Sequence, residues 1–332
     1  MSMWSCADPV KRIPDGTVTR PNPIRHRPYR RDRMKRHDDQ SSGIDRPASG
    51  MRRRVLKSGL IGAGLGAVGL AGYVWRIEPH WISIVHRELP IAHLPDSLVG
   101  KRMVQISDLH IGPVVSAGYL QKAINLVNQC RADLLVVTGD IITYHAGFKP
   151  EVIGVTLRGL RLPPLGAICI LGNHDYGVRW SQDRVAGQVA TELKRLGLTV
   201  LRNEVADVGG LQIAGIDDLW SPNFGPSAML ESLNPHQARL ALCHNPDVVD
   251  LDVWGGYRGW ILTGHTHGGQ CRFPLLGAPV LPVSNKRYDE GHFDLGDGRH
   301  LYISRGVGYM YRVRFNVRPE ITLFTLRRAA SQ

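Results

Sequence analysis

The chain has 332 residues, of which 43% are hydrophobic, and this is enough for one large α/β domain with a packed core plus a tail. Its formal charge of +12 is unevenly spread: residues 1–76 contain 16 Lys and Arg against 6 Asp and Glu, whereas residues 77–332 contain 25 against 23. The globular part therefore gives no case for a nucleic-acid partner, and five cysteines without C-x-x-C spacing indicate neither a zinc knuckle nor a disulfide framework.

The first 50 residues are rich in Arg, Pro, Asp and Ser and lack apolar periodicity, so we predict a disordered basic tail over residues 1–50. Alternatively, Met51 is the true start of the protein. A second pattern begins at Arg52, because residues 52–57 (RRRVLK) resemble the twin-arginine export signal R-R-x-F-L-K, with Val55 in place of Phe. The 18 residues that follow, 58–75, are uncharged and include six Gly.

As a helix, residues 58–75 would span roughly 27 Å, just short of the hydrocarbon core of about 30 Å. We predict that residues 51–76 form an uncleaved N-terminal membrane anchor, because no A-x-A cleavage pattern stands near its end. The twin-arginine translocation machinery would be a partner, the N-terminus would stay inside, and the following domain would lie on the outer, extracytoplasmic side of the cytoplasmic membrane. Two alternatives are a cleaved signal that leaves the protein soluble outside, and a Gly-rich helix packed on a soluble core.

The rest of the chain has the pattern of an α/β domain. Residues 77–98 form a lead-in with an edge strand at 81–85, and the domain covers residues 99–327. In its first half, apolar strands at 103–107, 134–138 and 167–171 alternate with amphipathic helices at 117–129, 152–160 and 185–196. Its second half has α+β character, with few helices and with strands at 212–216, 239–243, 260–263, 300–304 and 321–326. This pattern predicts two packed sheets flanked by helices.

Residues of the kind that bind metal ions follow five of the predicted strands. In chain order they are Asp108 and His110, Asp140, Asn173 with His174 and Asp175, His244, and His265 with His267. Two side chains spaced i and i+2 at a strand end point the same way. Carboxylate, imidazole and amide oxygen form a mixed N,O set that suits Mn, Fe or Zn. These side chains exceed the needs of one divalent ion, so we predict two ions about 3.5 to 4 Å apart, the spacing typical of phosphoryl transfer.

The blocks D-x-H, G-D, G-N-H-D, a distant His and G-H-T-H, in that order, resemble the calcineurin-like metallophosphoesterase superfamily. The segments 264–270 (GHTHGGQ), 215–218 (GIDD), 304–308 (SRGVG) and 314–320 (RFNVRPE) resemble its bacterial membrane-anchored or twin-arginine-exported branch. The resemblance implies a four-layer α-β-β-α sandwich of two mixed sheets, with two divalent metal ions as cofactors.

The resemblance also implies a role for each residue of the blocks. Asp108, His110 and His267 would hold the first metal, Asp140 would bridge, and Asn173, His244 and His265 would hold the second. His174 would contact the phosphate and protonate the leaving group as a general acid. Asp175 would not bind a metal itself but would hold the ligand-bearing loops in place. Loop residues that are candidates for substrate contact are Arg305, Tyr309 and Asn316.

Two departures from the protein Ser/Thr phosphatases of this superfamily concern the substrate. Asp140 is followed by Ile141, Ile142 and Thr143 where those phosphatases have x-V-D, so the Asp that partners their catalytic histidine is missing, and Leu171 rather than their phosphate-binding Arg precedes Gly172. We therefore expect hydrolysis of a phosphodiester or pyrophosphate bond, by direct attack of a metal-bridging hydroxide, rather than of a phosphoprotein. A lipid-like substrate, such as a phospholipid or a lipid-linked diphosphate, is an alternative with the same mechanism. An alternative of another class is a non-catalytic envelope protein that binds metal or a polymer on the same scaffold.

Overall fold

A computed structural model of the chain describes residues 48–329. The chain divides into two units between Leu56 and Lys57, and the helix α1 (Ala48–Gly72) crosses this division. The predicted disordered tail therefore lies almost wholly outside the described residues, and so does Cys6. The second unit contains every residue of the predicted metal-binding blocks and is described below.

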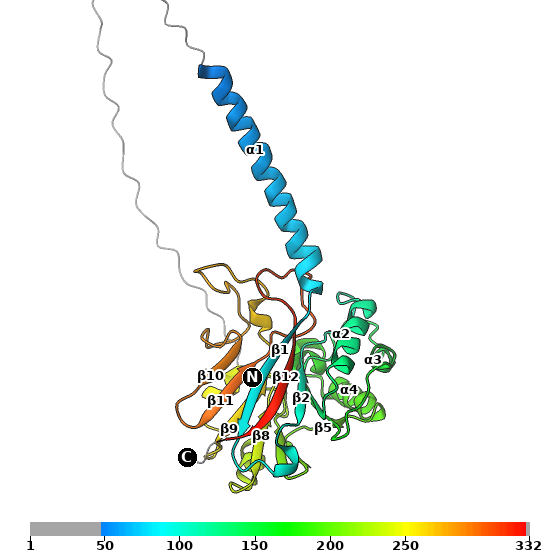
Figure 1. Cartoon of the computed structure of the whole chain (residues 1–332). Helices are drawn as coiled ribbons and strands as arrows, with labels where there is room; N and C mark the ends of the chain where they lie inside the picture. Colours follow the sequence, from blue (N-terminus) through cyan, green and yellow to red (C-terminus); the bar gives the residue numbers. More distant parts are fainter. Residues whose placement is uncertain (1–47, 330–332) are drawn as a thin grey trace, which may run out of the picture. The chain divides into compact units, whose positions relative to one another are not determined.

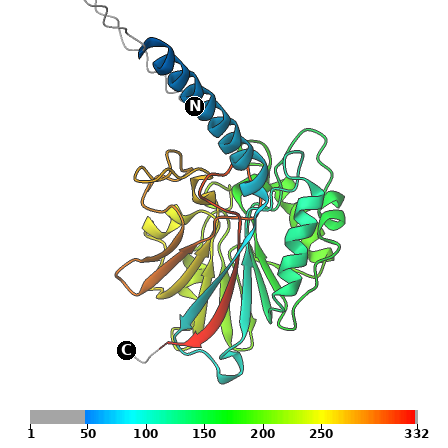
Figure 2. The ribbon, with the colours of Figure 1, turned by 45° about the horizontal axis from the view of Figure 1, so that its top comes forward.

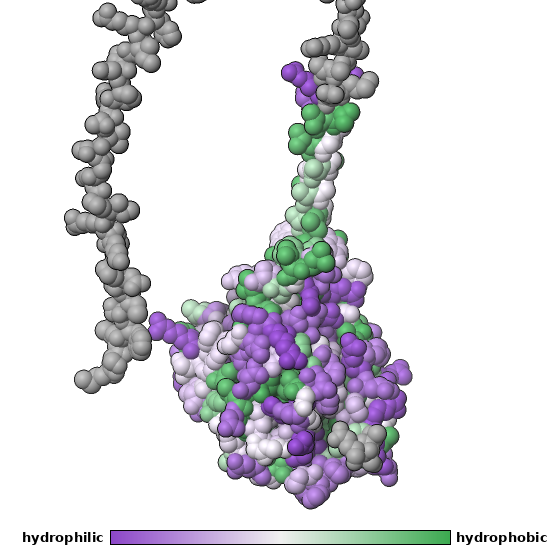
Figure 3. Space-filling model, turned by 90° about the vertical axis from the view of Figure 1, so that its left-hand side faces the viewer, coloured by the Kyte–Doolittle hydropathy of each residue, from purple (hydrophilic) through white to green (hydrophobic). Residues whose placement is uncertain are grey.

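The segment that begins in α1 is apolar and is not buried. The stretch Arg53–His80 is long and apolar enough to cross a membrane, with a mean hydropathy of 1.5 and 0% of its apolar window buried. In Figure 3 the helix is largely green, whereas the face of the domain turned to the viewer is mostly hydrophilic. The described residues bury none of this window and so give no support to the alternative of a Gly-rich helix packed on a soluble core. A signal and an anchor both remain compatible with this segment.

Two six-stranded sheets form the centre of the domain (Figure 1). The first has the order β1-β12-β2-β3-β4-β5, with strands β1 (Ser83–Ile91), β12 (Glu320–Arg328), β2 (Arg102–Ile106), β3 (Leu134–Thr138), β4 (Ala167–Ile170) and β5 (Thr199–Val200). The second has the order β10-β11-β9-β8-β7-β6, with strands β10 (Gly291–Asp294), β11 (Arg299–Ile303), β9 (Gly259–Thr263), β8 (Ala238–Leu242), β7 (Leu211–Gly215) and β6 (Glu204–Val208).

Both sheets are mixed. Strands β2 to β5 are parallel, whereas β12 runs antiparallel to β2 and parallel to β1. In the second sheet β7, β8, β9 and β11 are parallel, and the edge strands β6 and β10 are antiparallel to their neighbours. The predicted α/β class with two mixed sheets is confirmed. The predicted edge strand at 81–85 begins two residues too early and ends six too early, because β1 starts at Ser83 and pairs with β12 along its whole length to Ile91.

Helices cover the outer faces of the sheets. Figure 2 shows α2 (Ala117–Gln129), α3 (Glu151–Leu157) and α4 (Asp183–Arg195) on the outer face of the first sheet. The outer face of the second sheet is covered more thinly, by α5 (Ser227–Glu231) and a turn at Pro246–Asp250. One apolar cluster lies under the helices of each sheet, and a third lies between the sheets and contains residues of both sheets. These layers give the α-β-β-α sandwich that the sequence predicted.

The local sequence explains these elements. The Ser116 hydroxyl accepts the Tyr119 N–H at the start of α2, and Leu120, Ile124 and Val127 form the buried stripe of that helix. Every residue of β3 is buried, because this strand has helices on one side and the second sheet on the other. Parallel strands with both faces covered leave their carboxyl ends as the place where loops can carry functional side chains.

Candidate metal centre

The carboxyl ends of the two sheets bring the predicted metal-binding residues together. The loops after β2, β3 and β4 supply Asp108, His110, Asp140 and Asn173 from the first sheet, and those after β8 and β9 supply His244, His265 and His267 from the second. The Asp108 carboxylate accepts the backbone N–H of His265 at 3.1 Å, which ties a loop of one sheet to a loop of the other. Residues 157 positions apart thus become neighbours.

The side chains form two buried groups, each with ligand atoms within 4.8 Å of one another. The first is Asp108, His110 and His267, in which the two Nε2 atoms lie 3.0 Å apart and His267 Nε2 lies 3.3 Å from Asp108 Oδ1. In the second group, Asp140 Oδ2 lies 3.1 Å from His244 Nε2, and the same nitrogen lies 3.2 Å from Nδ1 of His265. Each group offers the N,O set that a divalent transition metal accepts.

Asp140 lies between the two groups. Its Oδ2 atom, 3.1 Å from His244 Nε2 in the second group, is also 3.7 Å from His110 Nε2 in the first. The Asp108 carboxylate is in turn 4.0 Å from His244 Nε2. The two groups are therefore adjacent, and one carboxylate reaches both, which is the arrangement of a dinuclear site.

Asn173 tests whether this cluster fits metal ions. Its side chain is 1% exposed, and its Oδ1 atom has no hydrogen-bond partner among residues 48–329. A buried amide oxygen without a partner is costly unless a ligand satisfies it. A cation is a ligand that would satisfy such an oxygen, so Asn173 and the His/Asp sets of the two groups fit a metal centre.

Hydrogen bonds behind the rings fix which nitrogen faces the cluster. The Nδ1 of His244 lies 2.7 Å from the Thr138 carbonyl oxygen, and the Nε2 of His265 lies 2.8 Å from the Pro282 carbonyl oxygen. A carbonyl only accepts, so these nitrogens carry the protons and the opposite nitrogens present lone pairs to the cluster. The ring of His110 is held at Nδ1 by the Thr143 hydroxyl at 2.9 Å.

Burial keeps the rings of His110 and His265 in the neutral form that binds metals, whereas for His244 the lowering of the pKa by burial is outweighed by the nearby Asp140 carboxylate, which raises it. Burial lowers the pKa of His110 and of His265 to about 3, so both are neutral at pH 7. For a carboxyl group the same burial acts in the opposite direction. It raises the pKa of Asp108 to about 7, because the carboxylate there lacks water and lies near the negative charge of Asp140. Positive charge supplied at this place would stabilise both carboxylates, as divalent cations do.

The backbone around the cluster is strained. Left-handed φ angles occur at Asp108 (55°), His110 (50°), Asp140 (51°), His265 (72°) and His267 (51°). Such conformations cost roughly 1–3 kcal/mol for each non-Gly residue and concentrate at functional sites. The loops also approach closely, since a Cβ on Gly172 would overlap the Asp140 carboxylate, and one on Gly264 would overlap the Ser107 and Asp108 side chains. The strain is offset by the packing and hydrogen bonds that hold these loops.

His174 lies beside the cluster, not within it. Its ring is edge-on to His110, with centroids 5.1 Å apart, and its backbone N–H donates to Asp140 Oδ1 at 2.9 Å. On its other side is Trp180, which stacks on Trp220 at 4.7 Å. Trp220 contacts His265 edge-on at 4.8 Å. The two indoles therefore form an aromatic wall that joins His174 to the second group.

The other predicted site residues have contacts that stabilise the fold. The Asp175 carboxylate accepts the backbone N–H groups of Ile141, Ile142 and Gly172, and so ties the loop after β3 to the end of β4. The Arg305 guanidinium pairs with Glu320 at 2.6 Å. The hydroxyl of Tyr309 lies 3.4 Å from His80 Nε2, and Asn316 has a φ of 58°. Substrate contact by Arg305, Tyr309 and Asn316 stays a prediction.

Several supporting residues were not found from the sequence. They are the orienting residues Thr138, Thr143 and Pro282 and the wall residues Trp180 and Trp220. Carbonyl groups have no sequence signal, so Thr138 and Pro282 could not have been found. Thr143 stands three residues after Asp140, and Trp180 stands six residues after His174. A polar or aromatic residue this close to a metal-binding motif is the sequence signal by which they could have been found.

Comparison with known proteins agrees with this geometry. A family model described as calcineurin-like phosphoesterase matches residues 101–269. The uncharacterized metallophosphoesterase YkuE of Bacillus subtilis (strain 168) is 34% identical over 292 residues, covering 83% of this chain and 98% of that protein. The phosphodiesterase YaeI of Escherichia coli (strain K12) is 32% identical over 282 residues, with the same coverage of 83% and 98%.

A third relative is more distant. The UDP-2,3-diacylglucosamine pyrophosphatase LpxG of Chlamydia trachomatis serovar D is 28% identical over 305 residues, covering 76% of this chain and 92% of that protein. The matched family segment begins in front of β2 and ends just after His267, so it contains all of the residues of the two groups. The chain therefore belongs to the calcineurin-like phosphoesterase family and is a metal-dependent phosphoesterase.

Proposed function

We propose that the protein hydrolyses a phosphodiester or pyrophosphate bond, and that it does so while tethered to the outer face of the cytoplasmic membrane. One observation supports the catalytic part of this proposal. Two buried His/Asp groups each have a histidine close to Asp140 Oδ2, and the buried Asn173 Oδ1 atom has no hydrogen-bond partner among the described residues. When bound, two divalent cations would polarise the phosphoryl oxygens and lower the pKa of the attacking water. Asp108, His110 and His267 would hold one, Asn173, His244 and His265 the other, and Asp140 both.

The protein's own residues then orient the substrate and move a proton. The His174 backbone is fixed by its hydrogen bond to Asp140, and its ring stands edge-on to His110 next to the cluster. From this position His174 would donate a proton to the oxygen of the leaving group, which makes it the general acid. Trp180 and Trp220 would pack against that leaving group and exclude water from it. No side chain needs to form a covalent bond to phosphorus.

The proposed substrate class has two supports. YaeI is by name a phosphodiesterase and LpxG a pyrophosphatase, and both bonds join a phosphoryl group to a large leaving group. An aromatic wall beside His174 suits such a leaving group better than it suits a phosphate monoester. The lipid-like variant of the proposal is supported by exposed apolar residues in the loop after His267, where Leu275 is 106% exposed and Leu276 84%.

The change His174→Ala tests the catalytic proposal. With bis-p-nitrophenyl phosphate and Mn²⁺, we expect kcat to fall roughly 10²- to 10⁴-fold, because the general acid is lost while the cation ligands stay in place. The matched control is His236→Ala, at an exposed histidine, which should leave kcat unchanged. An unchanged kcat in the His174 variant, at equal metal content, would remove this role. Absence of wild-type activity with Mn, Fe and Zn would favour the non-catalytic scaffold.

Replacing Arg52 and Arg53 together with Lys tests the export route. Twin-arginine recognition requires the Arg pair, so we expect the double variant to remain in the cytoplasmic fraction, as assayed by fractionation and protease accessibility in intact cells. Changing Arg30 and Arg31 to Lys keeps the same charge and serves as the control, with unchanged export. Delivery of the Arg52/Arg53 variant to the outer side would refute the route without touching the phosphoesterase assignment.

A further inference from the structure

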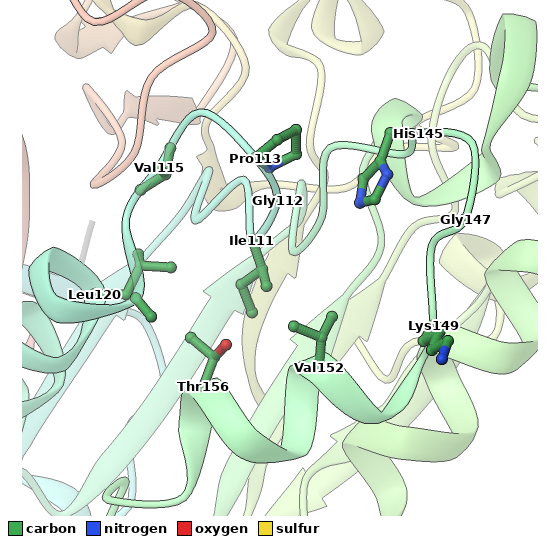
Figure 4. A pocket seen from close by; sticks show the side chains of 11 residues that line it. Ile111, Gly112, Pro113, Val115, Leu120, His145, Gly147, Lys149, Val152 and Thr156 are labelled. Atoms are coloured by element: carbon green, nitrogen blue, oxygen red, sulfur yellow. The ribbon is translucent and has the colours of Figure 1, made fainter.

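A pocket of about 390 Å³ is lined by the loops after β2 and β3 and by the helices α2 and α3 (Figure 4). Its floor consists of Ile111, Val115 and Leu120, each 2% exposed, and of Thr156, which is 6% exposed. Pockets for small organic ligands commonly measure roughly 300–1,000 Å³ and have mostly apolar walls. The size and floor of this pocket therefore match a small apolar ligand.

The pocket is continuous with the metal-binding loops. The hydrogen-bond ladder between β2 and β3 extends past both strands: the His110 N–H donates to the Asp140 carbonyl at 3.0 Å, and the Ile111 N–H donates to the Ile141 carbonyl at 2.8 Å. The Thr143 N–H then donates to the Ile111 carbonyl at 3.1 Å. The floor residue Ile111 thus directly follows His110, and the pocket and the first metal group share this hydrogen-bonded segment.

The two sides of the pocket differ in chemistry. Figure 4 shows His145 and Lys149 on the loop after β3, with Val152 of α3 beside Lys149 and with Val115 and Leu120 on the opposite side. No acidic side chain lines the pocket in the described part of the chain. Basic groups beside an apolar floor suit a ligand that has both an anionic group and a hydrocarbon part.

We propose that this pocket binds an aliphatic chain of the phosphoester substrate, while the phosphoryl group lies at the metal-binding cluster. The floor offers one side-chain hydroxyl, that of Thr156, so a sugar or nucleobase lying on it would have His145 and Lys149 at the side as its other side-chain partners and would leave most of its polar groups unpaired, which is unfavourable. An aliphatic chain has no such groups. The inference rests on the proposed function and specifies its substrate as one with a hydrocarbon substituent.

The change Val152→Trp tests the pocket. Val152 lines it from α3 and is 37% exposed, so an indole there would fill the space, whereas Val155 on the same helix is 62% exposed and does not line it. With the full chain in detergent and Mn²⁺, hexyl p-nitrophenyl phosphate and methyl p-nitrophenyl phosphate are compared. Burial of a methylene improves binding roughly fourfold, so we expect wild-type kcat/KM to be at least about tenfold higher for the hexyl ester.

In the Val152→Trp variant we expect this preference to fall to about twofold or less, with the methyl ester hydrolysed at the wild-type rate. Val155→Trp should behave like the wild type. Equal kcat/KM for the two esters in the wild type, or equal effects of the two Trp substitutions, would overturn the inference.

A binding measurement separates this inference from the proposed function. Hexylphosphonate and methylphosphonate cannot be hydrolysed at their P–C bonds, and their Kd values are measured by calorimetry with Mn²⁺ present. Tighter binding of hexylphosphonate to the wild type and to Val155→Trp, but not to Val152→Trp, would support the pocket even if no ester were hydrolysed. Ester hydrolysis without any chain-length preference, in activity or binding, would leave the phosphoesterase function intact and refute the pocket.

Discussion

Replacing Asp140 with Asn is expected to lower kcat/KM for bis-p-nitrophenyl phosphate at least about 10³-fold, corresponding to roughly 4 kcal/mol of lost transition-state stabilisation. Its Oδ2 atom lies close to a histidine of each group, at 3.7 Å from His110 Nε2 and 3.1 Å from His244 Nε2. An amide removes a negative charge from between two cations and can turn an NH₂ group toward them. Both cations should therefore bind more weakly.

Metal analysis by mass spectrometry separates this effect from misfolding. Wild-type protein is expected to hold close to two divalent ions per chain and to lose activity with a chelator, whereas the Asp140→Asn variant should hold fewer at the same free concentration. Asp252→Asn, at an exposed carboxylate, should keep both the ions and the activity. Full metal content with full activity in the Asp140 variant would show that this residue does not bridge.

The sequence predicted the buried elements better than the edges. The bounds of α2 (Ala117–Gln129) and β3 (Leu134–Thr138) agree with the prediction at both ends, because a capped amphipathic stripe and a short apolar run are strong local signals. The strands β5, β6 and β10 were missed. β6 (Glu204–Val208) is an edge strand with mostly exposed side chains, so its pairing with β7 depends on tertiary contacts that no local pattern shows.

The same distinction applies to the candidate site. Strand-end residues such as Asp108 and His265 could be found by spacing alone, because parallel strands end at one edge of their sheet. The contacts that orient these side chains could not be found from the sequence. The unpaired oxygen of Asn173 and the carbonyl partner of His244 depend on positions of backbone groups far away in sequence. The sequence therefore predicted residues that come together in the two groups, whereas their orientation is visible in the structure alone.

Replacing Glu320 with Ala is expected to destabilise the domain by about 3–5 kcal/mol, the usual cost of breaking a buried ion pair from one side. Glu320 is 3% exposed and accepts hydrogen bonds at 2.6 Å from the Tyr302 hydroxyl, the Thr322 hydroxyl and Arg305 Nε. The change removes this acceptor from the two hydroxyls and leaves Arg305 with the longer contact to Glu290 at 3.5 Å, and the Tm should fall by roughly 10 °C for a domain of this size.

The reciprocal variant Arg305→Ala decides what Arg305 does. If its guanidinium serves the ion pair, Arg305→Ala should lower the Tm nearly as much as Glu320→Ala, because the carboxylate is then buried without its partner, and KM should stay unchanged. Glu204→Ala, at an exposed position of β6, is the control and should leave the Tm within about 1 °C. A higher KM at an unchanged Tm would instead identify Arg305 as a substrate contact. The pair with Glu320 would then hold the guanidinium in place for the substrate and add little to the stability of the sandwich.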